Sequence, residues 1–155
     1  MAWIEGSMTR TFTVRAPYDA VVEYFCSPEQ FQRAFSQLER AEQIDADTWR
    51  WVLKEKNEKG IRYQADYQVR YVREEAGCSW KETAGNMRTT GKVICRDLGS
   101  GRTEIEYAET LAPDLPIPRL AAKVFGGIVG REVSAGIGDF LERSTTILET
   151  EHGAS

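Results

Sequence analysis

Residues 78–96 read CSWKETAGNMRTTGKVICR, which is two alternating runs joined by a short turn. In the first run, Trp80 lies between the polar residues Ser79 and Lys81. A period of two is typical of a strand with one buried face and one exposed face. The Gly-Asn pair at 85–86 is a turn signal. This segment therefore predicts an antiparallel hairpin.

The same period of two continues on both sides of this hairpin. Further alternating runs cover residues 10–15, 49–54, 63–72 and 102–111. Gly, Asn and Asp residues separate most of them, as expected for tight turns. In each run one side is apolar or aromatic and the other is polar. The pattern predicts an antiparallel meander with one wet face and one apolar face.

Helical patterns precede and follow the meander. Pro17 and the Ser27-Pro28 pair predict the starts of two short helices within residues 17–36. From about Arg119 to Thr150 the apolar residues recur at helical spacing, and they include Val124, Ile128 and Ile137. The glycines between 126 and 130 predict a bend in this long helix.

The predicted fold is α+β. A seven-stranded, curved antiparallel sheet wraps around the long C-terminal helix, with two short helices after the first strand. The apolar face of the sheet needs a cover, and the C-terminal helix carries the long apolar stripe that can provide it. Residues 1–155 are predicted to form a single domain, with an ordered core of about 9–150.

Composition and charge exclude several classes of function. The formal net charge of −4 leaves no basic footprint for nucleic acid. No apolar run approaches the roughly 20 residues of a membrane-spanning helix. The three cysteines, Cys26, Cys78 and Cys95, are odd in number and widely spaced. They indicate reduced thiols in a cytoplasmic protein rather than a disulfide framework.

The chain also lacks the usual signatures of metal and nucleotide sites. Its one histidine, His152, lies in a polar tail, which argues against histidine-based catalysis and against a histidine metal site. The glycines at 126–130 lie inside a helix and do not form a phosphate-binding loop. We therefore expect no metal and no cofactor.

Several short motifs resemble those of a known superfamily. They are Val14-Arg15-Ala16-Pro17 followed by Val21 and Val22, Trp80 followed by Gly91, and Arg102-Thr103-Glu104-Ile105. With the order of elements, they resemble the START/Bet v 1-like (SRPBCC) helix-grip superfamily, especially its bacterial polyketide cyclase/coenzyme Q-binding-like members. The resemblance implies a helix-grip fold and an apolar cavity for a lipid, isoprenoid, hormone or polyketide. The motifs carry no catalytic residues to transfer.

Loop lengths suggest how the strands align. Trp80 is predicted to lie opposite Gly91 and Tyr71, with Glu109 on the other side of Gly91. In a further row, Ala84 is predicted to lie on the inner face. The predicted ligand-contacting residues are Trp51, Tyr67, Tyr71, Trp80, Gly91, Tyr107, Val124, Ile128 and Ile137.

Two acids are candidates for acid–base chemistry. Glu82 and Glu109 share the strand phase of apolar neighbours, where desolvation would raise the pKa of a carboxyl group. The alternative is that each lies at a wet strand end or pairs with an arginine.

Three functions remain open on these grounds. The first is binding of a small hydrophobic molecule between the sheet and the C-terminal helix. The second is a cyclase/dehydratase-type enzyme that uses these carboxylates without a metal or nucleotide. The third is a protein-interaction module with a collapsed cavity. A homodimer is compatible with each.

Overall fold

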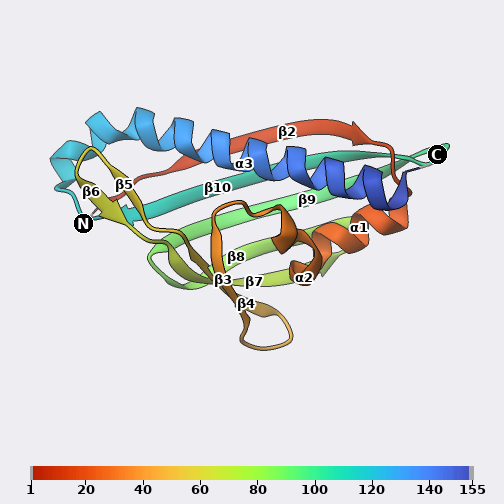
Figure 1. Ribbon diagram of the computed structural model, residues 1–155, viewed down its shortest axis with the longest axis horizontal. Coiled ribbons are helices and arrows are strands. Elements are labelled where there is room, and N and C mark those ends of the chain that lie inside the picture. Colours follow the sequence, from red (N-terminus) through yellow and green to blue (C-terminus); the bar gives the residue numbers. More distant parts are fainter. Residues whose placement is uncertain (1, 154–155) are drawn as a thin grey trace.

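In the computed structural model, a curved antiparallel sheet lies beneath one long helix (Figure 1). The structure describes residues 2–153. The strands are β1 (Ala2–Trp3), β2 (Gly6–Val14), β3 (Leu38–Gln43), β4 (Thr48–Leu53), β5 (Lys56–Glu58), β6 (Ile61–Tyr63), β7 (Asp66–Glu74), β8 (Gly77–Gly85), β9 (Met87–Gly99) and β10 (Arg102–Leu115). The helices are α1 (Tyr18–Cys26), α2 (Pro28–Phe31) and α3 (Ala122–His152), with 3-10 turns at Gln32–Ala34 and Arg119–Ala121.

The strands of the main sheet follow the order β1-β10-β9-β8-β7-β4-β3, and β2 also pairs with β10. β1 and β2 share one edge of β10, where β2 pairs along Thr103–Leu111 and β1 pairs at Asp114 and Leu115. The predicted sheet of seven long strands is therefore confirmed, with the two-residue β1 added. β5 and β6 form a separate small hairpin.

The register of the central strands agrees with the prediction. Trp80 pairs with Gly91 and with Tyr71 on its two sides, and Gly91 pairs with Glu109. The predicted position of Ala84 is wrong. A bulge after Gln68 moves Gly85 opposite Tyr67 and leaves Ala84 exposed.

Glycine is required at this bulge for two reasons. Gly85 has a φ of +108°, and a Cβ there would come within 2.3 Å of the Asp66 carbonyl oxygen. A sequence pattern with strict alternation does not reveal such an extra residue.

β10 runs beyond the predicted strand of residues 102–111 and continues to Leu115. Pro113 is buried beside β1, and its carbonyl accepts a hydrogen bond from the Ile4 amide at 3.1 Å. α3 is one continuous helix of 31 residues. The predicted bend at the glycines between 126 and 130 stays a prediction.

The C-terminal half of α3 is held by a cluster of aromatic side chains. The Phe140 ring lies 5.0 Å from the ring of Phe35 and 6.0 Å from that of Phe31, centroid to centroid. Further along α3, the Tyr24 hydroxyl of α1 donates a hydrogen bond of 2.8 Å to the buried Ser144 hydroxyl. These contacts close one end of the space between helix and sheet.

The N-terminal half of α3 faces the sheet with a different side from the predicted one. Val124 is 72% exposed, so its predicted inward orientation is wrong. The buried face of α3 is formed by Val129, Val133 and Phe140. A series of residues spaced four apart does not stay on one side of a helix that has 3.6 residues per turn. Val124 therefore falls on the outer side.

Candidate functional site

A cavity of about 270 Å³ lies between the sheet and the N-terminal half of α3. This is slightly below the roughly 300–1,000 Å³ that is usual for small-molecule pockets. Most of its lining is apolar. The sheet contributes Tyr67, Met87, Leu111 and Leu115, and the helix contributes Phe125, Ile128, Val129, Val133, Ile137 and Phe140.

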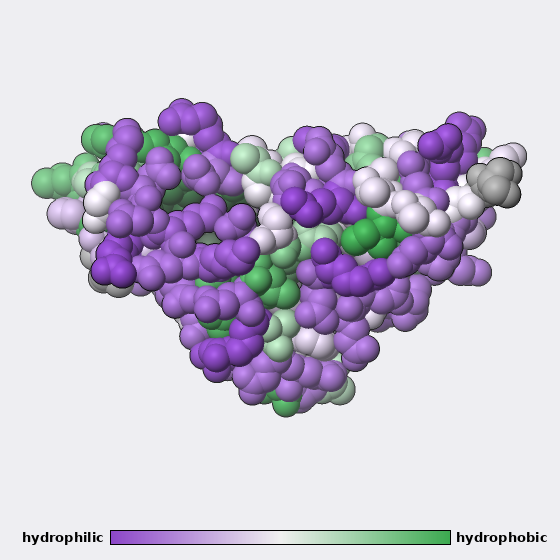
Figure 2. All heavy atoms as spheres, in the orientation of Figure 1, coloured by the Kyte–Doolittle hydropathy of each residue, from purple (hydrophilic) through white to green (hydrophobic). Residues whose placement is uncertain are grey.

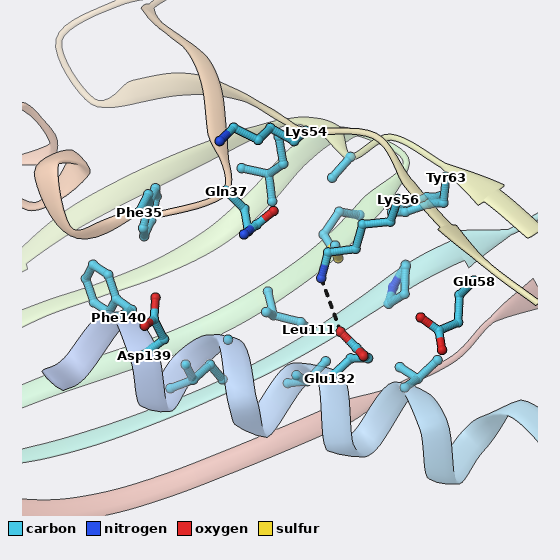
Figure 3. A pocket seen from close by; sticks show the side chains of 18 of the residues that line it. Phe35, Gln37, Lys54, Lys56, Glu58, Tyr63, Leu111, Glu132, Asp139 and Phe140 are labelled. Carbon is cyan, nitrogen blue, oxygen red and sulfur yellow. Dashed lines mark hydrogen bonds and ion pairs between the residues drawn. The ribbon is translucent and has the colours of Figure 1, made fainter. Parts of the chain in front are cut away.

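Charged side chains gather at the side of the cavity where the β5–β6 hairpin approaches α3 (Figure 3). Lys56 of β5 reaches across to Glu132 of α3, with 3.2 Å between Nζ and Oε2. Both side chains are about half exposed, so this ion pair contributes little to stability. The hairpin and helix therefore meet here through a contact that water can separate.

Glu109 places a carboxylate on the sheet side of the cavity. Its Oε2 accepts hydrogen bonds from Trp80 Nε1 at 2.9 Å and from Thr89 Oγ1 at 3.2 Å. Its Oε1 accepts a hydrogen bond from the Tyr107 hydroxyl at 3.0 Å. The strand register explains this cluster. Glu109 of β10 pairs with Gly91 of β9, and Gly91 pairs on its other side with Trp80 of β8. Without a side chain at Gly91, the indole can reach across the intervening strand.

Burial raises the pKa of the Glu109 carboxyl above its usual range, although all three hydrogen bonds act in the opposite direction. Desolvation of the charged form is therefore the stronger effect. No arginine or lysine donates to this carboxylate among residues 2–153. The predicted environment of Glu109, an inward acid beside Gly91, agrees with the structure, and the pairing with arginine is not found.

Tyr67 adds a hydroxyl group to the same cavity. Burial, followed by the nearby charge of Glu109, raises the pKa of this phenol, so it stays protonated at neutral pH. Within the described part of the chain its hydroxyl forms no hydrogen bond, whereas the Tyr63 hydroxyl donates one of 2.6 Å to the Asn86 carbonyl. The cavity thus presents a free phenolic donor near a carboxylate.

The nine residues predicted to contact a ligand fall into two groups. Three of them line the cavity, namely Tyr67, Ile128 and Ile137. The other six do not, namely Trp51, Tyr71, Trp80, Gly91, Tyr107 and Val124. That any of these residues contacts a ligand stays a prediction.

Several of the residues in the second group support the cavity from behind. Trp80 and Tyr107 donate to Glu109, and Trp51 Nε1 donates a hydrogen bond of 3.0 Å to the Tyr71 hydroxyl. They hold polar groups in place rather than forming the wall. Phase alone identifies the inner face of a sheet, but it does not distinguish the part under the cavity from the part under packed aromatic rings.

Glu82 occupies the same face as Trp80 but does not line the cavity. It pairs with Val69 of β7, and its Oε2 is buried without a hydrogen-bond partner among residues 2–153. A buried oxygen of this kind usually contacts an ordered water. Of the two predicted acids, the structure brings only Glu109 to the cavity.

Sequence reasoning missed several residues of the wall and rim. Phe35 and Phe125 line the cavity, and Lys56 and Glu132 lie at its rim. Phe125 follows Val124 directly, so the true phase of α3 would have identified it. Lys56 comes from the β5–β6 hairpin, which is too short and too polar to show a clear alternation, and Glu132 lies on the side of α3 that faces this hairpin.

The described residues hold no cluster of three or more His, Cys, Asp or Glu side chains that could hold a metal ion. Among the same residues, no helix has the length and apolarity needed to cross a membrane.

A long helix gripped by a curved antiparallel sheet, with a cavity between them, defines the helix-grip class of folds. Comparison with solved structures gives the same assignment. The Zhui aromatase/cyclase from Streptomyces sp. R1128 is similar, with a TM-score of 0.72, 14% identity and 94% of each chain covered. A START superfamily protein from Mycobacterium smegmatis matches with a TM-score of 0.71 and 11% identity, covering 93% of this chain and 97% of that one.

Norcoclaurine synthase from Thalictrum flavum, in complex with dopamine and hydroxybenzaldehyde, matches with a TM-score of 0.61 and 11% identity, covering 99% of this chain and 91% of that one. No protein-family model and no curated protein sequence matches the chain. The chain therefore has the START/Bet v 1-like (SRPBCC) fold that its sequence motifs predict. At these identities the likeness concerns the fold.

Proposed function

We propose that this protein binds a small, mostly apolar molecule in the cavity between the sheet and α3. The observation that carries this proposal is the cavity itself, about 270 Å³ in volume and lined mainly by aliphatic and aromatic side chains. An apolar ligand would remove this surface from water, which is favourable in proportion to the area buried. The open space also argues against the interaction module with a collapsed cavity.

The polar groups of the cavity give the ligand an orientation. Glu109 supplies an acceptor, and the Tyr67 hydroxyl supplies a donor without a protein partner in the described chain. A few placed polar groups in an apolar pocket are typical of specific small-molecule sites. A ligand with an apolar body and one polar end would satisfy both.

Acid–base catalysis is the second candidate, and one observation favours it. The pKa of Glu109 is raised by burial, which brings a carboxyl group closer to the range useful for proton transfer at neutral pH. The aromatase/cyclase and norcoclaurine synthase structures show that enzymes occur among proteins of similar fold. In this alternative Glu109 would exchange a proton with the ligand while Tyr67 donates a hydrogen bond to it.

The cysteines bear on the compartment in which the protein works. The free thiols of Cys26, Cys78 and Cys95 fit a reducing compartment, so we place the protein in the cytoplasm. We assign no cofactor and no nucleic-acid partner, and a homodimer stays compatible with the proposal.

The test fills the cavity from the helix. Gly136 lines the cavity and has no atom within 4 Å of an added Cβ, so Gly136→Phe places a ring in the open space. Gly126→Phe makes the same change in the same helix at a residue that does not line the cavity and also has no atom within 4 Å of an added Cβ. Binding of a hydrophobic fluorescent probe should weaken by at least about tenfold in the first variant and stay near wild type in the second.

Equal binding in both variants, or no saturable binding by the wild type, would contradict the proposal. Native mass spectrometry followed by organic extraction identifies any ligand carried through purification. If Glu109→Gln still binds the extracted compound, and the wild type returns it chemically unchanged, the binding function is supported over the enzyme.

A further inference from the structure

The N-terminal part of α3 and the 3-10 turn before it carry an apolar and basic surface on their outer side. Leu120 is 93% exposed and Val124 is 72% exposed. Lys123, Gly127 and Arg131 continue the same side of the helix, because successive steps from Leu120 are three, four and four residues. We call these five residues the outer stripe. They face away from the cavity.

The charge of this region is opposite to that of the whole protein. Residues 115–131 contain three basic residues, Arg119, Lys123 and Arg131, and no Asp or Glu, although the net charge of the chain is −4. None of the three belongs to an ion pair within residues 2–153. The flanking acid Glu132 is already paired with Lys56.

Trp3 extends the surface beside the start of α3. Its side chain is 37% exposed, and with Arg119 and Ala122 it borders a shallow hollow that also includes Asp114. The Arg88 guanidinium lies 4.1 Å from the centroid of the Trp3 ring. Hydrophobic atoms are exposed at the end of the molecule where α3 begins (Figure 2). Tryptophan is enriched where proteins meet the boundary between lipid and water.

We propose that the outer stripe, with Trp3 and Arg119, docks on the surface of an anionic lipid bilayer. A helix side with exposed aliphatic residues and flanking basic residues fits the boundary between headgroups and acyl chains. The basic residues attract anionic headgroups at short range, which offsets the repulsion from the net negative chain. A second copy of this surface would present the same positive charge, so a symmetric contact between two copies is disfavoured.

This inference goes beyond ligand binding and rests on separate residues. It also has a consequence for the cavity, because the opposite side of the same helix segment supplies Phe125, Ile128 and Val129 to the cavity wall. Docking would therefore place one wall of the cavity at the bilayer surface, where apolar molecules dissolve.

The test is co-sedimentation of the full chain with phosphatidylcholine vesicles, alone or mixed with phosphatidylglycerol. We expect the wild type to pellet with the mixed vesicles and to remain largely in solution with phosphatidylcholine alone. Lys123→Glu/Arg131→Glu should lower the partition coefficient by at least about tenfold, since each basic residue contributes about fivefold near an anionic surface. Leu120→Ser/Val124→Ser should also lower it, by removal of the apolar contact.

A matched control changes exposed aliphatic residues elsewhere. Val72 and Ile94 are 46% and 40% exposed on the outer face of the sheet, so Val72→Ser/Ile94→Ser should leave vesicle binding unchanged. Circular dichroism checks that each variant is folded. Equal binding by the stripe variants and the control would overturn the proposal.

Two other outcomes would also overturn it. One is a wild type that stays in solution with both vesicle types. The other is a dimer in analytical ultracentrifugation that Leu120→Ser/Val124→Ser dissociates, since the stripe would then be covered by a second copy. Leu120 and Val124 do not line the cavity, so Leu120→Ser/Val124→Ser should still bind the fluorescent probe when no vesicles are present. Probe binding therefore distinguishes failure of membrane docking from failure of the proposed ligand binding.

Discussion

The indole ring of Trp80 lies directly against the backbone of Gly91 on the neighbouring strand. A Cβ at Gly91 would stand 2.3 Å from Cζ2 of the ring and 2.7 Å from its Nε1. The same Nε1 donates the 2.9 Å hydrogen bond to Glu109. The absence of one side chain therefore sets the position of the indole and, through it, the position of the Glu109 carboxylate.

Gly91→Ala should destabilise the protein by about 1–3 kcal/mol, because the indole must move and packed interiors tolerate extra atoms poorly. Urea unfolding followed by tryptophan fluorescence measures this change. Gly126→Ala is the control, since nothing lies within 4 Å of its added Cβ. It should stabilise the helix by up to about 1 kcal/mol. Equal effects of the two substitutions would contradict the tight contact with Trp80.

Glu109→Gln should change the pH dependence of stability. The pKa of Glu109 is raised in the folded protein, so its contribution to stability is present below the unfolded pKa and is lost as pH rises through the folded value. Glutamine cannot ionise, and its amide can donate to the Tyr107 hydroxyl while its oxygen accepts from Trp80 and Thr89. Thermal melts from pH 5 to 8 should show a decline for the wild type that the variant lacks.

Glu106→Gln is the matched control for this measurement. Glu106 lies on the same strand with an exposed side chain, so the substitution should preserve the decline with pH. A wild type whose melting temperature is flat over this range would place the Glu109 carboxylate in contact with water. Acid–base chemistry at this site would then lose its basis.

Tyr24→Phe should destabilise the protein by about 1 kcal/mol, because the buried Ser144 hydroxyl loses the donor of its 2.8 Å hydrogen bond. Burial also raises the pKa of Tyr24 to about 12. The stability that Tyr24 provides should therefore fall as pH rises from about 10 through this value. Tyr18→Phe, at a half-buried phenol without a hydrogen bond in the described chain, should change neither quantity. Chemical unfolding at pH 7 and pH 11 measures both effects.

The three thiols should differ in reactivity. Cys26 is half-buried at the end of α1, and the neighbouring Cys78 thiol lowers the pKa of its thiol. Cys95 is buried, and burial raises the pKa of its thiol to about 12. An aromatic disulfide reagent at pH 7.5 should modify Cys26 first, and the other two only after unfolding. Mass spectrometry locates the label, and Cys26→Ser should abolish the fast phase.

Much of the sheet could be predicted because its side chains alternate strictly. The pairing of Trp80 with Gly91 and Tyr71 follows from loop lengths and period alone. The sequence does not reveal β3, because Leu38–Gln43 reads LERAEQ and shows no alternation of apolar and polar residues. Such an edge strand, with most of its side chains exposed, does not require this alternation. The β5–β6 hairpin shows no clear alternation for a similar reason.

The candidate site was harder to predict than the sheet. The inward orientation of Glu109 followed from its position beside Gly91, but the cavity lies only where α3 leaves the aromatic cluster of its C-terminal half. The location of the cavity depends on how α3 is rotated about its own axis. An error of one residue in the predicted phase of the helix changes which side chains face inward, as happened for Val124. Which inward residues line the cavity is therefore decided by packing between elements distant in sequence.

The pairing of β2 with β10 also constrains when the fold can form. Gly6–Val14 finds its partner strand about a hundred residues later in the chain, and α3 follows that strand. During synthesis, at roughly 5–20 residues per second, the first long strand waits several seconds without a partner. The meander from β3 to β9 needs only local hairpins and can assemble in that interval. We therefore expect the cavity to close late in folding, because its closure requires contacts of high sequence separation, which form slowly.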